Sequence, residues 1–197
     1  QARAGKHPTD WKTYVPPKPT FTGIKNLTHY PLEKLVERID WTPFFATWEL
    51  AGLYPEIFND EVVGSEAKKL FDDAQAMLKK IIDNKWVTAS AVFGFWPANA
   101  VGDDVELYTD DSRTTVLKTF HFLRQQMDKP TTRANLCLAD WVAPKETGVA
   151  DYLGGFAVTA GHEMEKQVAV FEADHDDYNA ILLKALADRL AEAFAEH

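Results

Sequence analysis

Apolar residues recur at helical spacing along much of the chain. Between residues 65 and 84 they fall three or four positions apart, which predicts a long amphipathic helix with one buried side. The same spacing predicts helices over residues 163–173 and 176–197, the second of them long. A shorter helix is predicted from Pro31, a residue suited to the first helical turn, because apolar side chains follow at Leu32, Leu35, Val36 and Ile39.

A second short helix is predicted directly after this one. Thr42 is a suitable N-cap, Pro43 fits the first helical position, and Gly52 can end the helix. The aromatic side chains of the segment are then expected to face inward, namely Phe44, Phe45 and Trp48. Asp40 is expected in the joint between the two helices.

Several other segments have the composition of strands. Residues 86–96 are rich in Val, Phe, Ala and Trp and lack the charge pattern of a helix, so they predict a buried strand. Residues 105–108 and 156–159 predict two more, because each is mostly apolar and lies near glycines that can form turns. Residues 116–123 fit either a strand or a helix, and their pattern leaves both open.

The order of these elements indicates the fold class. Helices and strands do not alternate, and no crossover period of about 30 residues recurs, which favours an α+β fold with an antiparallel sheet over a doubly wound parallel sheet. Residues 1–28 carry several prolines and little periodicity, so we interpret them as an extended arm or linker. Regular structure is expected from Pro31, within a single domain over residues 29–197.

The formal net charge of −9 argues against a nucleic-acid partner, because Lys and Arg are scattered rather than gathered on a basic face. An acidic balance suits ordinary solubility, a cationic ligand or a basic partner surface. No run approaches the roughly 20 apolar residues that span a bilayer, and we expect no signal peptide and no membrane contact. Cys137 is the only cysteine, which excludes an internal disulfide and fits a cytoplasmic location.

The motifs of several enzyme classes are missing from the sequence. Gly154-Gly155 forms neither a dinucleotide-binding nor a phosphate-loop motif. His162-Glu163 begins like a zinc-protease helix, but Lys166 stands where the second histidine is needed, so no zinc site is expected. Cys137 has no histidine nearby and is interpreted as a small buried strand residue rather than a nucleophile. We therefore predict no catalytic residue and no metal ligand.

Two acidic features remain open. Asp40 precedes Trp41, and a carboxylate beside an aromatic ring can pair with a ligand ammonium or sulfonium, although it can also cap the helix junction. On the last helix, Lys184, Asp188 and Glu192 share one stripe, which is either a solvated charge ladder or a functional face. The apolar face predicted for that helix consists of Tyr178, Ile181, Leu182, Ala185, Leu186, Ala193 and Phe194.

Several segments, taken in order, resemble one family. They include Asp40-Trp41-Thr42-Pro43-Phe44-Phe45, Phe95-Trp96-Pro97-Ala98, Leu123-Arg124-Gln125-Gln126, Leu138-Ala139-Asp140, and the stretch from His175 to Glu196. From about residue 30 onward the chain resembles the activation domain of vitamin B12-dependent methionine synthase, a methyltransferase. That resemblance implies a module that binds S-adenosylmethionine (AdoMet) and supports reductive remethylation of oxidised cobalamin.

The resemblance also implies roles for three residues. Asp40 matches the family's AdoMet-binding aspartate, and Glu192 matches a glutamate near the same ligand. Asp188 matches an aspartate that contacts the cobalamin module and helps to hold the displaced cobalt-ligating histidine. In the family, cobalamin is held by a separate domain, zinc belongs to other domains of the parent enzyme, and flavodoxin or a flavoprotein reductase is the expected electron donor.

One departure from the family pattern concerns AdoMet itself. The family's R-P-A-x-G-Y motif supplies an arginine for the AdoMet carboxylate and follows the last helix, whereas this sequence ends at His197. We therefore expect a C-terminally truncated form of the domain, with no activity as an isolated fragment. The alternative is a non-catalytic docking remnant that contacts a cobalamin protein without binding AdoMet.

Overall fold

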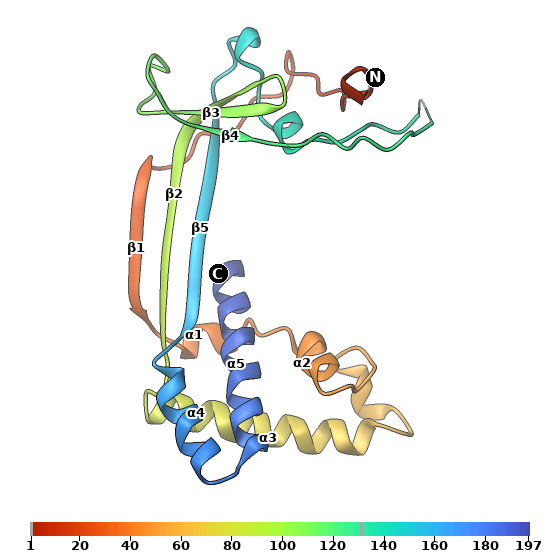
Figure 1. The fold of residues 1–197 in the computed structure, drawn as a ribbon, viewed down its shortest axis with the longest axis vertical. Coiled ribbons are helices and arrows are strands. Elements are labelled where there is room, and N and C mark those ends of the chain that lie inside the picture. The colour runs from red at the N-terminus through yellow and green to blue at the C-terminus, as the bar shows by residue number, and fades with distance from the viewer. Residues whose placement is uncertain (1, 131) are drawn as a thin grey trace. The chain divides into compact units, whose positions relative to one another are not determined.

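The predicted α+β fold is confirmed in a computed structural model, which describes residues 2–130 and 132–197 (Figure 1). The five-stranded sheet has the order β1-β2-β3-β4, and β5 pairs with β2. The chain divides into two compact units, unit 1 (residues 1–25 and 93–155) and unit 2 (residues 26–92 and 156–197). The boundaries fall within three strands, β1 (Gly23–Tyr30), β2 (Thr88–Val101) and β5 (Asp151–His162).

Unit 1 is built on an antiparallel meander. The end of β2 pairs with β3 (Asp104–Tyr108), and β3 pairs with β4 (Val116–His121). Gly102 forms the tight turn between β2 and β3 with a φ of 66°, a conformation that glycine adopts without a Cβ penalty. The segment that fitted either a strand or a helix is therefore a strand, because pairing with β3 satisfies its backbone hydrogen bonds.

Short 3-10 helices complete unit 1: η1 (Ala2–Gly5), η3 (Leu138–Trp141) and η4 (Lys145–Thr147). Cys137 is buried, as expected, but the prediction that it lies in a strand is wrong, because it is the N-cap of η3. Gly5 of η1 contacts the rest of this unit, because the backbone N–H of Asn135 donates a hydrogen bond to the Gly5 carbonyl at 2.7 Å. The small apolar core contains Ala98, Ala100, Val105, Leu107, Cys137, Ala139 and Val142.

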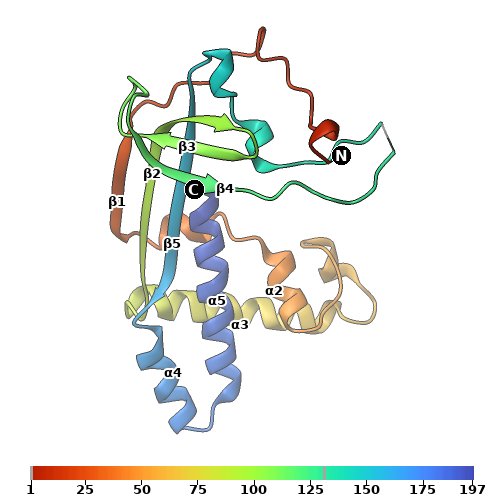
Figure 2. The ribbon, with the colours of Figure 1, turned by 45° about the horizontal axis from the view of Figure 1, so that its top comes forward.

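Unit 2 carries the helices. They are α1 (Glu33–Val36), α2 (Trp41–Thr47), η2 (Glu56–Asn59), α3 (Gly64–Asp83), α4 (Met164–Ala173) and α5 (Asp177–Glu196). The long helix α5 packs against α1, α2, α3 and α4, and lies side by side with α4 (Figures 1 and 2). Its neighbours thus surround α5 on several sides.

The long helices agree closely with the sequence pattern. α3 covers almost the whole predicted range, and its buried residues recur at the expected spacing, at Ala67, Leu70, Ala74, Met77, Leu78 and Ile81. Each fully buried side chain of leucine size stabilises the fold by about 1.5–3 kcal/mol. Tertiary burial of one side therefore explains why these helices could be recognised from periodicity.

The ends of several elements were mispredicted. Regular structure does not begin at Pro31, because Gly23–Tyr30 already forms β1. Most of its side chains are exposed, so β1 has no alternating apolar pattern. β5 also extends beyond residues 156–159 and contains Gly154. A Cβ on Gly154 would come within 2.7 Å of the Phe95 ring, so close packing rather than a turn explains this glycine.

Candidate functional site

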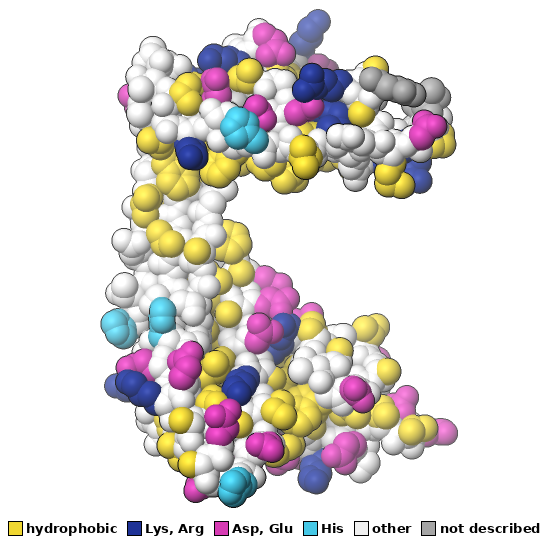
Figure 3. All heavy atoms as spheres, viewed as in Figure 1, with side chains coloured by type: hydrophobic (Ala, Val, Ile, Leu, Met, Phe, Trp, Pro, Cys, Tyr) yellow, Lys and Arg dark blue, Asp and Glu magenta, His cyan; other side chains and the backbone are white. Residues whose placement is uncertain are grey.

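Helix α5 has one buried and one solvent-facing side. Its N-cap is Asp176, whose carboxylate accepts a hydrogen bond from the backbone N–H of Asn179 at 3.0 Å. Asp188 and Glu192 lie on the solvent side, with side chains 72% and 46% exposed. Four positions correspond to about 40° around a helix, so the two carboxylates share one face. Acidic side chains gather beside the C-terminal half of α5 (Figure 3).

Arg189 is bonded to both of these acidic residues. Its Nη2 donates to Asp188 Oδ2 at 2.6 Å, and its Nη1 pairs with Glu192 Oε2. The Arg189 side chain is only 14% exposed, so most of it lies against protein atoms rather than in water. The single guanidinium of Arg189 therefore forms ion pairs with two carboxylates that are exposed to solvent.

Lys184, Asp188 and Glu192 are all solvent-exposed, as a solvated charge ladder requires, but the ladder is not continuous in its ion pairs. Lys184 Nζ pairs with Glu172 Oε1 of α4 at 3.2 Å, and not with the next acidic residue of its own helix. The neighbouring helix α4 packs against α5 and supplies this partner. The acidic pair of α5 consequently depends on Arg189 alone for the ion pairs that the structure shows.

The predicted apolar face of α5 is correct only in part. Leu182, Leu186, Ala193 and Phe194 are buried, whereas Tyr178 and Ile181 are exposed, because neighbouring helices cover less than the full apolar arc. The hydroxyl of Tyr178 donates a hydrogen bond to Asp73 Oδ2 at 2.7 Å. The side chain is only partly exposed, and its partial burial, with the help of that bond, raises the pKa of Tyr178 to about 12. The solvent side of α5 thus combines apolar and acidic side chains.

Asp40 caps helix α2. Its Oδ1 accepts a hydrogen bond from the Thr42 amide at 3.0 Å, and its backbone is extended, as an N-cap requires. The prediction that Thr42 is the cap is therefore wrong by two positions. Thr42 Oγ1 instead accepts a hydrogen bond from the Tyr54 amide at 3.1 Å. Asp40 itself is exposed, so the cap leaves its carboxylate accessible to solvent.

The aromatic residues after Asp40 are core residues. Trp41 is buried, and its ring packs edge-on against Phe44 at 5.3 Å and against Phe71 of α3 at 4.8 Å. A buried ring in such contacts is not free to receive a cation on its face. The contribution of Trp41 is therefore to fix the start of α2, and with it the position of the Asp40 carboxylate.

Two aromatic contacts define how this segment runs along α5. The ring of Tyr30 stacks on Phe194 with centroids 4.8 Å apart, near the end of α5. The ring of Trp48 lies 5.2 Å from that of Tyr178, near its beginning. Residues 30–48 therefore pass α5 in the opposite direction, and Asp40 belongs to the part of the segment between the two contacts. On α5, Asp188 and Glu192 lie between the same two contacts, that is, between Tyr178 and Phe194.

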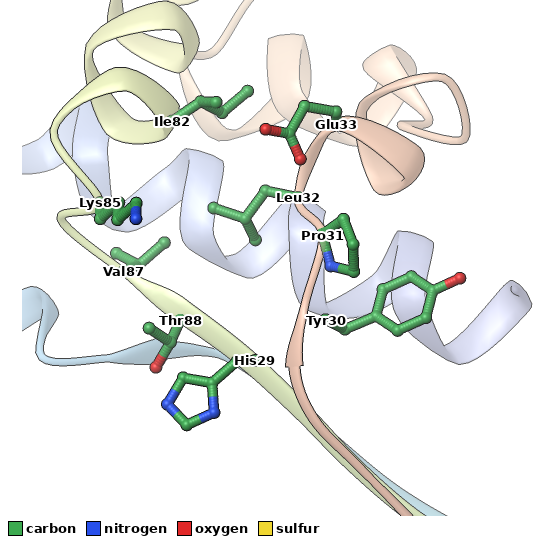
Figure 4. Close-up of a pocket in the computed structure, with 9 residues that line it drawn as sticks. All are labelled: His29, Tyr30, Pro31, Leu32, Glu33, Ile82, Lys85, Val87 and Thr88. Carbon is green, nitrogen blue, oxygen red and sulfur yellow. The ribbon is translucent and has the colours of Figure 1, made fainter.

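A small cavity of about 190 Å³ lies elsewhere in unit 2 (Figure 4). It is formed by the end of β1, the start of α1, the end of α3 and the start of β2. Its lining residues are His29, Tyr30, Pro31, Leu32, Glu33, Ile82, Lys85, Val87 and Thr88. None of the three acidic candidates lines this cavity. The sequence pattern did not predict a site at these residues, because they come from two segments that only the tertiary fold brings together.

Unit 1 contains a buried charge cluster that the sequence did not predict. The Arg124 guanidinium donates to Asp140 at 2.6 and 2.7 Å, to Asp103 at 2.8 and 3.0 Å, and to the Asn135 carbonyl at 2.6 Å. Burial acts to raise the pKa of Asp140, but the bonds from Arg124 and the Cys137 amide outweigh it and hold that pKa below its usual 3.8. Arg124 and Asp140 belong to segments that carry the family resemblance, and in the structure they join separate segments of unit 1.

The part of the chain that the structure describes contains neither a metal-binding cluster nor a membrane-spanning helix. Residues 2–130 and 132–197 bring no three His, Cys, Asp or Glu side chains into an arrangement suited to a metal ion. Within the same residues, no helix has the length and apolar character needed to cross a membrane.

One family model and one solved structure are similar to this chain. The family model described as vitamin B12 dependent methionine synthase, activation domain, matches residues 31–197. A crystal structure of the MetH reactivation domain bound to AdoHcy is similar to this chain with a TM-score of 0.95 and 53% sequence identity. The match covers 99% of this chain and 59% of that chain, so this chain spans under two thirds of the related structure.

Proposed function

The chain belongs to the family of vitamin B12-dependent methionine synthase activation domains, and on that premise we propose that it binds AdoMet for remethylation of an oxidised cobalamin. The observation that carries the proposal is its 53% identity, across 99% of its length, to a reactivation domain bound to AdoHcy. AdoHcy is AdoMet without the transferred methyl group, so both ligands present the same nucleoside and amino-acid portions.

The acidic residues of unit 2 suit the charge of this ligand. AdoMet carries a sulfonium and an α-ammonium group, and carboxylates form strong charge-assisted hydrogen bonds and ion pairs with such cations. Asp40 uses Oδ1 for the helix cap and is exposed, and Glu192 is 46% exposed. We propose that Asp40 and Glu192 contact AdoMet, in agreement with the family pattern.

Asp188 has a different proposed role. Its side chain is 72% exposed, which leaves it accessible to a protein partner. We propose that it contacts the cobalamin-binding domain of methionine synthase. When bound, AdoMet supplies the methyl group, the cobalamin of that separate domain accepts it, and flavodoxin or a flavoprotein reductase supplies the electron. The contribution of this chain is to position the reactants, which requires neither a general acid nor a general base.

Calorimetric titration with AdoMet tests the ligand assignment in the methionine synthase of which the chain is part. Glu192→Gln should weaken binding by about 1–3 kcal/mol, the range for losing a charged hydrogen-bond partner. The matched control is Glu165→Gln, an exposed residue of α4, which should bind AdoMet like the wild type. Unchanged affinity in Glu192→Gln would reject that residue as a ligand contact. An absence of binding by the wild type would favour the docking-remnant alternative.

The role of Asp188 is tested by comparing two reactions of the same enzyme. Asp188→Ala should slow the AdoMet-dependent recovery of methylated cobalamin, followed in the visible spectrum, while turnover with methyltetrahydrofolate continues. The separation is expected because the two reactions need different domain arrangements, and Asp188 would stabilise only one of them. An unchanged recovery rate would mean that Asp188 is an ordinary surface residue.

A further inference from the structure

Arg189 joins the two acidic residues of α5 through a single side chain. We infer that Arg189 is a positioning residue that couples the AdoMet contact at Glu192 to the partner contact at Asp188. The inference rests on the proposed function, because it takes those two roles as given. It adds a residue that contacts neither the ligand nor the partner and acts through both carboxylates.

The geometry of the guanidinium supports this role. Separate nitrogen atoms serve the two carboxylates, Nη2 for Asp188 and Nη1 for Glu192. Each bond engages one oxygen of the carboxylate, Oδ2 and Oε2, so a second oxygen remains on each residue for a ligand or a partner. A rigid planar fork can hold two acceptors at once, whereas a lysine ammonium is a single point charge.

The burial of Arg189 distinguishes it from a surface ion pair. Its side chain is 14% exposed, against 72% for Asp188 and 46% for Glu192. A cation held close to the helix and paired with two exposed carboxylates loses less side-chain entropy on pairing than a free surface arginine. The alternative basic residue of this stretch, Lys184, pairs with Glu172 of α4 and is not available to replace it.

The coupling follows from charge balance. One guanidinium shared by two carboxylates leaves a net charge of −1 on the trio. If Asp188 loses its charge, Arg189 pairs with Glu192 alone. The guanidinium then neutralises the Glu192 carboxylate more fully, and Glu192 becomes a poorer partner for a cationic ligand. A change at the partner contact thus alters AdoMet affinity, and Arg189 transmits the effect.

A double-mutant cycle tests this coupling by AdoMet titration of the methionine synthase that contains the chain. In the wild-type background, Asp188→Asn should weaken AdoMet binding about three- to fivefold, the upper range for a partly exposed ion pair. In the Arg189→Met background, the same change should alter affinity by less than about 1.5-fold. Equal effects in the two backgrounds would overturn the inference, because Asp188 would then act on the ligand independently of Arg189.

Lys184→Met is the matched control, since it removes a cation from the same helix without touching either acidic residue. Asp188→Asn should keep its three- to fivefold effect in that background, and a lost effect there would overturn the inference. Circular dichroism shows whether Arg189→Met is folded. If it is not, Arg189→Lys replaces it in the cycle and should retain less than half of the coupling; full coupling would overturn the role of the fork.

The outcomes also separate this inference from the proposed function. If the wild type does not bind AdoMet, or if Glu192→Gln leaves its affinity unchanged, the proposed function fails. If AdoMet binds and Glu192→Gln weakens it, but the cycle is additive, only the role of Arg189 fails.

Discussion

Arg124→Met tests how the buried charge cluster stabilises unit 1. Methionine keeps an unbranched, apolar side chain but removes the cation between Asp140 and Asp103. The Asp140 side chain is 0% exposed. Among the described residues it would then keep the Cys137 backbone N–H at 3.0 Å and the more distant Lys6 Nζ at 3.9 Å. An uncompensated carboxylate would therefore remain in the interior.

The expected cost follows from that burial. Breaking a buried ion pair by removing one partner costs about 3–5 kcal/mol, whereas an exposed pair contributes at most about 1 kcal/mol. Arg124 is 3% exposed and Asp140 0%, so the buried value applies. The double change Arg124→Met with Asp140→Asn should recover more than half of the loss, because the amide oxygen can still accept the Cys137 hydrogen bond while the buried charge is gone.

Urea unfolding followed by tryptophan fluorescence measures these differences. The reasoning would be refuted by a loss below about 1 kcal/mol for Arg124→Met, or by a double variant no more stable than the single one. A pH series gives a second check. Because the folded pKa of Asp140 lies below 3.8, its contribution is complete above pH 3.8 and is lost as the pH falls through the folded value. The stability gap between the wild type and Asp140→Asn should therefore be constant near neutral pH and narrow below pH 3.8.

Three further predictions concern unit 2. Asp40→Asn keeps an N-cap acceptor for Thr42 and should change thermal stability little, whereas Asp40→Ala should cost about 1 kcal/mol; equal losses would contradict the cap. Tyr178→Phe removes the hydrogen bond to Asp73. Since the folded pKa of Tyr178 is raised from 10 to about 12, the stability that the wild type gains should be constant below pH 10 and fall between about 10 and 12. Leu186→Ala leaves a core cavity and should cost about 2–5 kcal/mol in urea unfolding; a loss under 1 kcal/mol would place Leu186 outside the core.

The sequence alone determined the features that depend on local periodicity and on residue identity. The helices α3 and α5 follow from apolar residues that recur every three or four positions, and the irregular order of elements predicted an α+β fold. Asp40, Asp188 and Glu192 could be selected only because their surrounding segments resemble a family. Spacing left each of them open, since a cap or a solvated stripe produces the same local pattern.

Tertiary structure decided which groups pair with which. β1 lacks an apolar pattern and forms because β2 offers backbone partners. Tyr178 stays 41% exposed, and its hydroxyl reaches Asp73 of α3. Lys184 turns to Glu172 of α4, so the acidic pair of α5 depends on Arg189 instead. Arg124 and Asp140 meet across 16 positions of chain. Ion pairs and strand pairing depend on distances in space between segments, and the linear spacing of residues does not specify these distances.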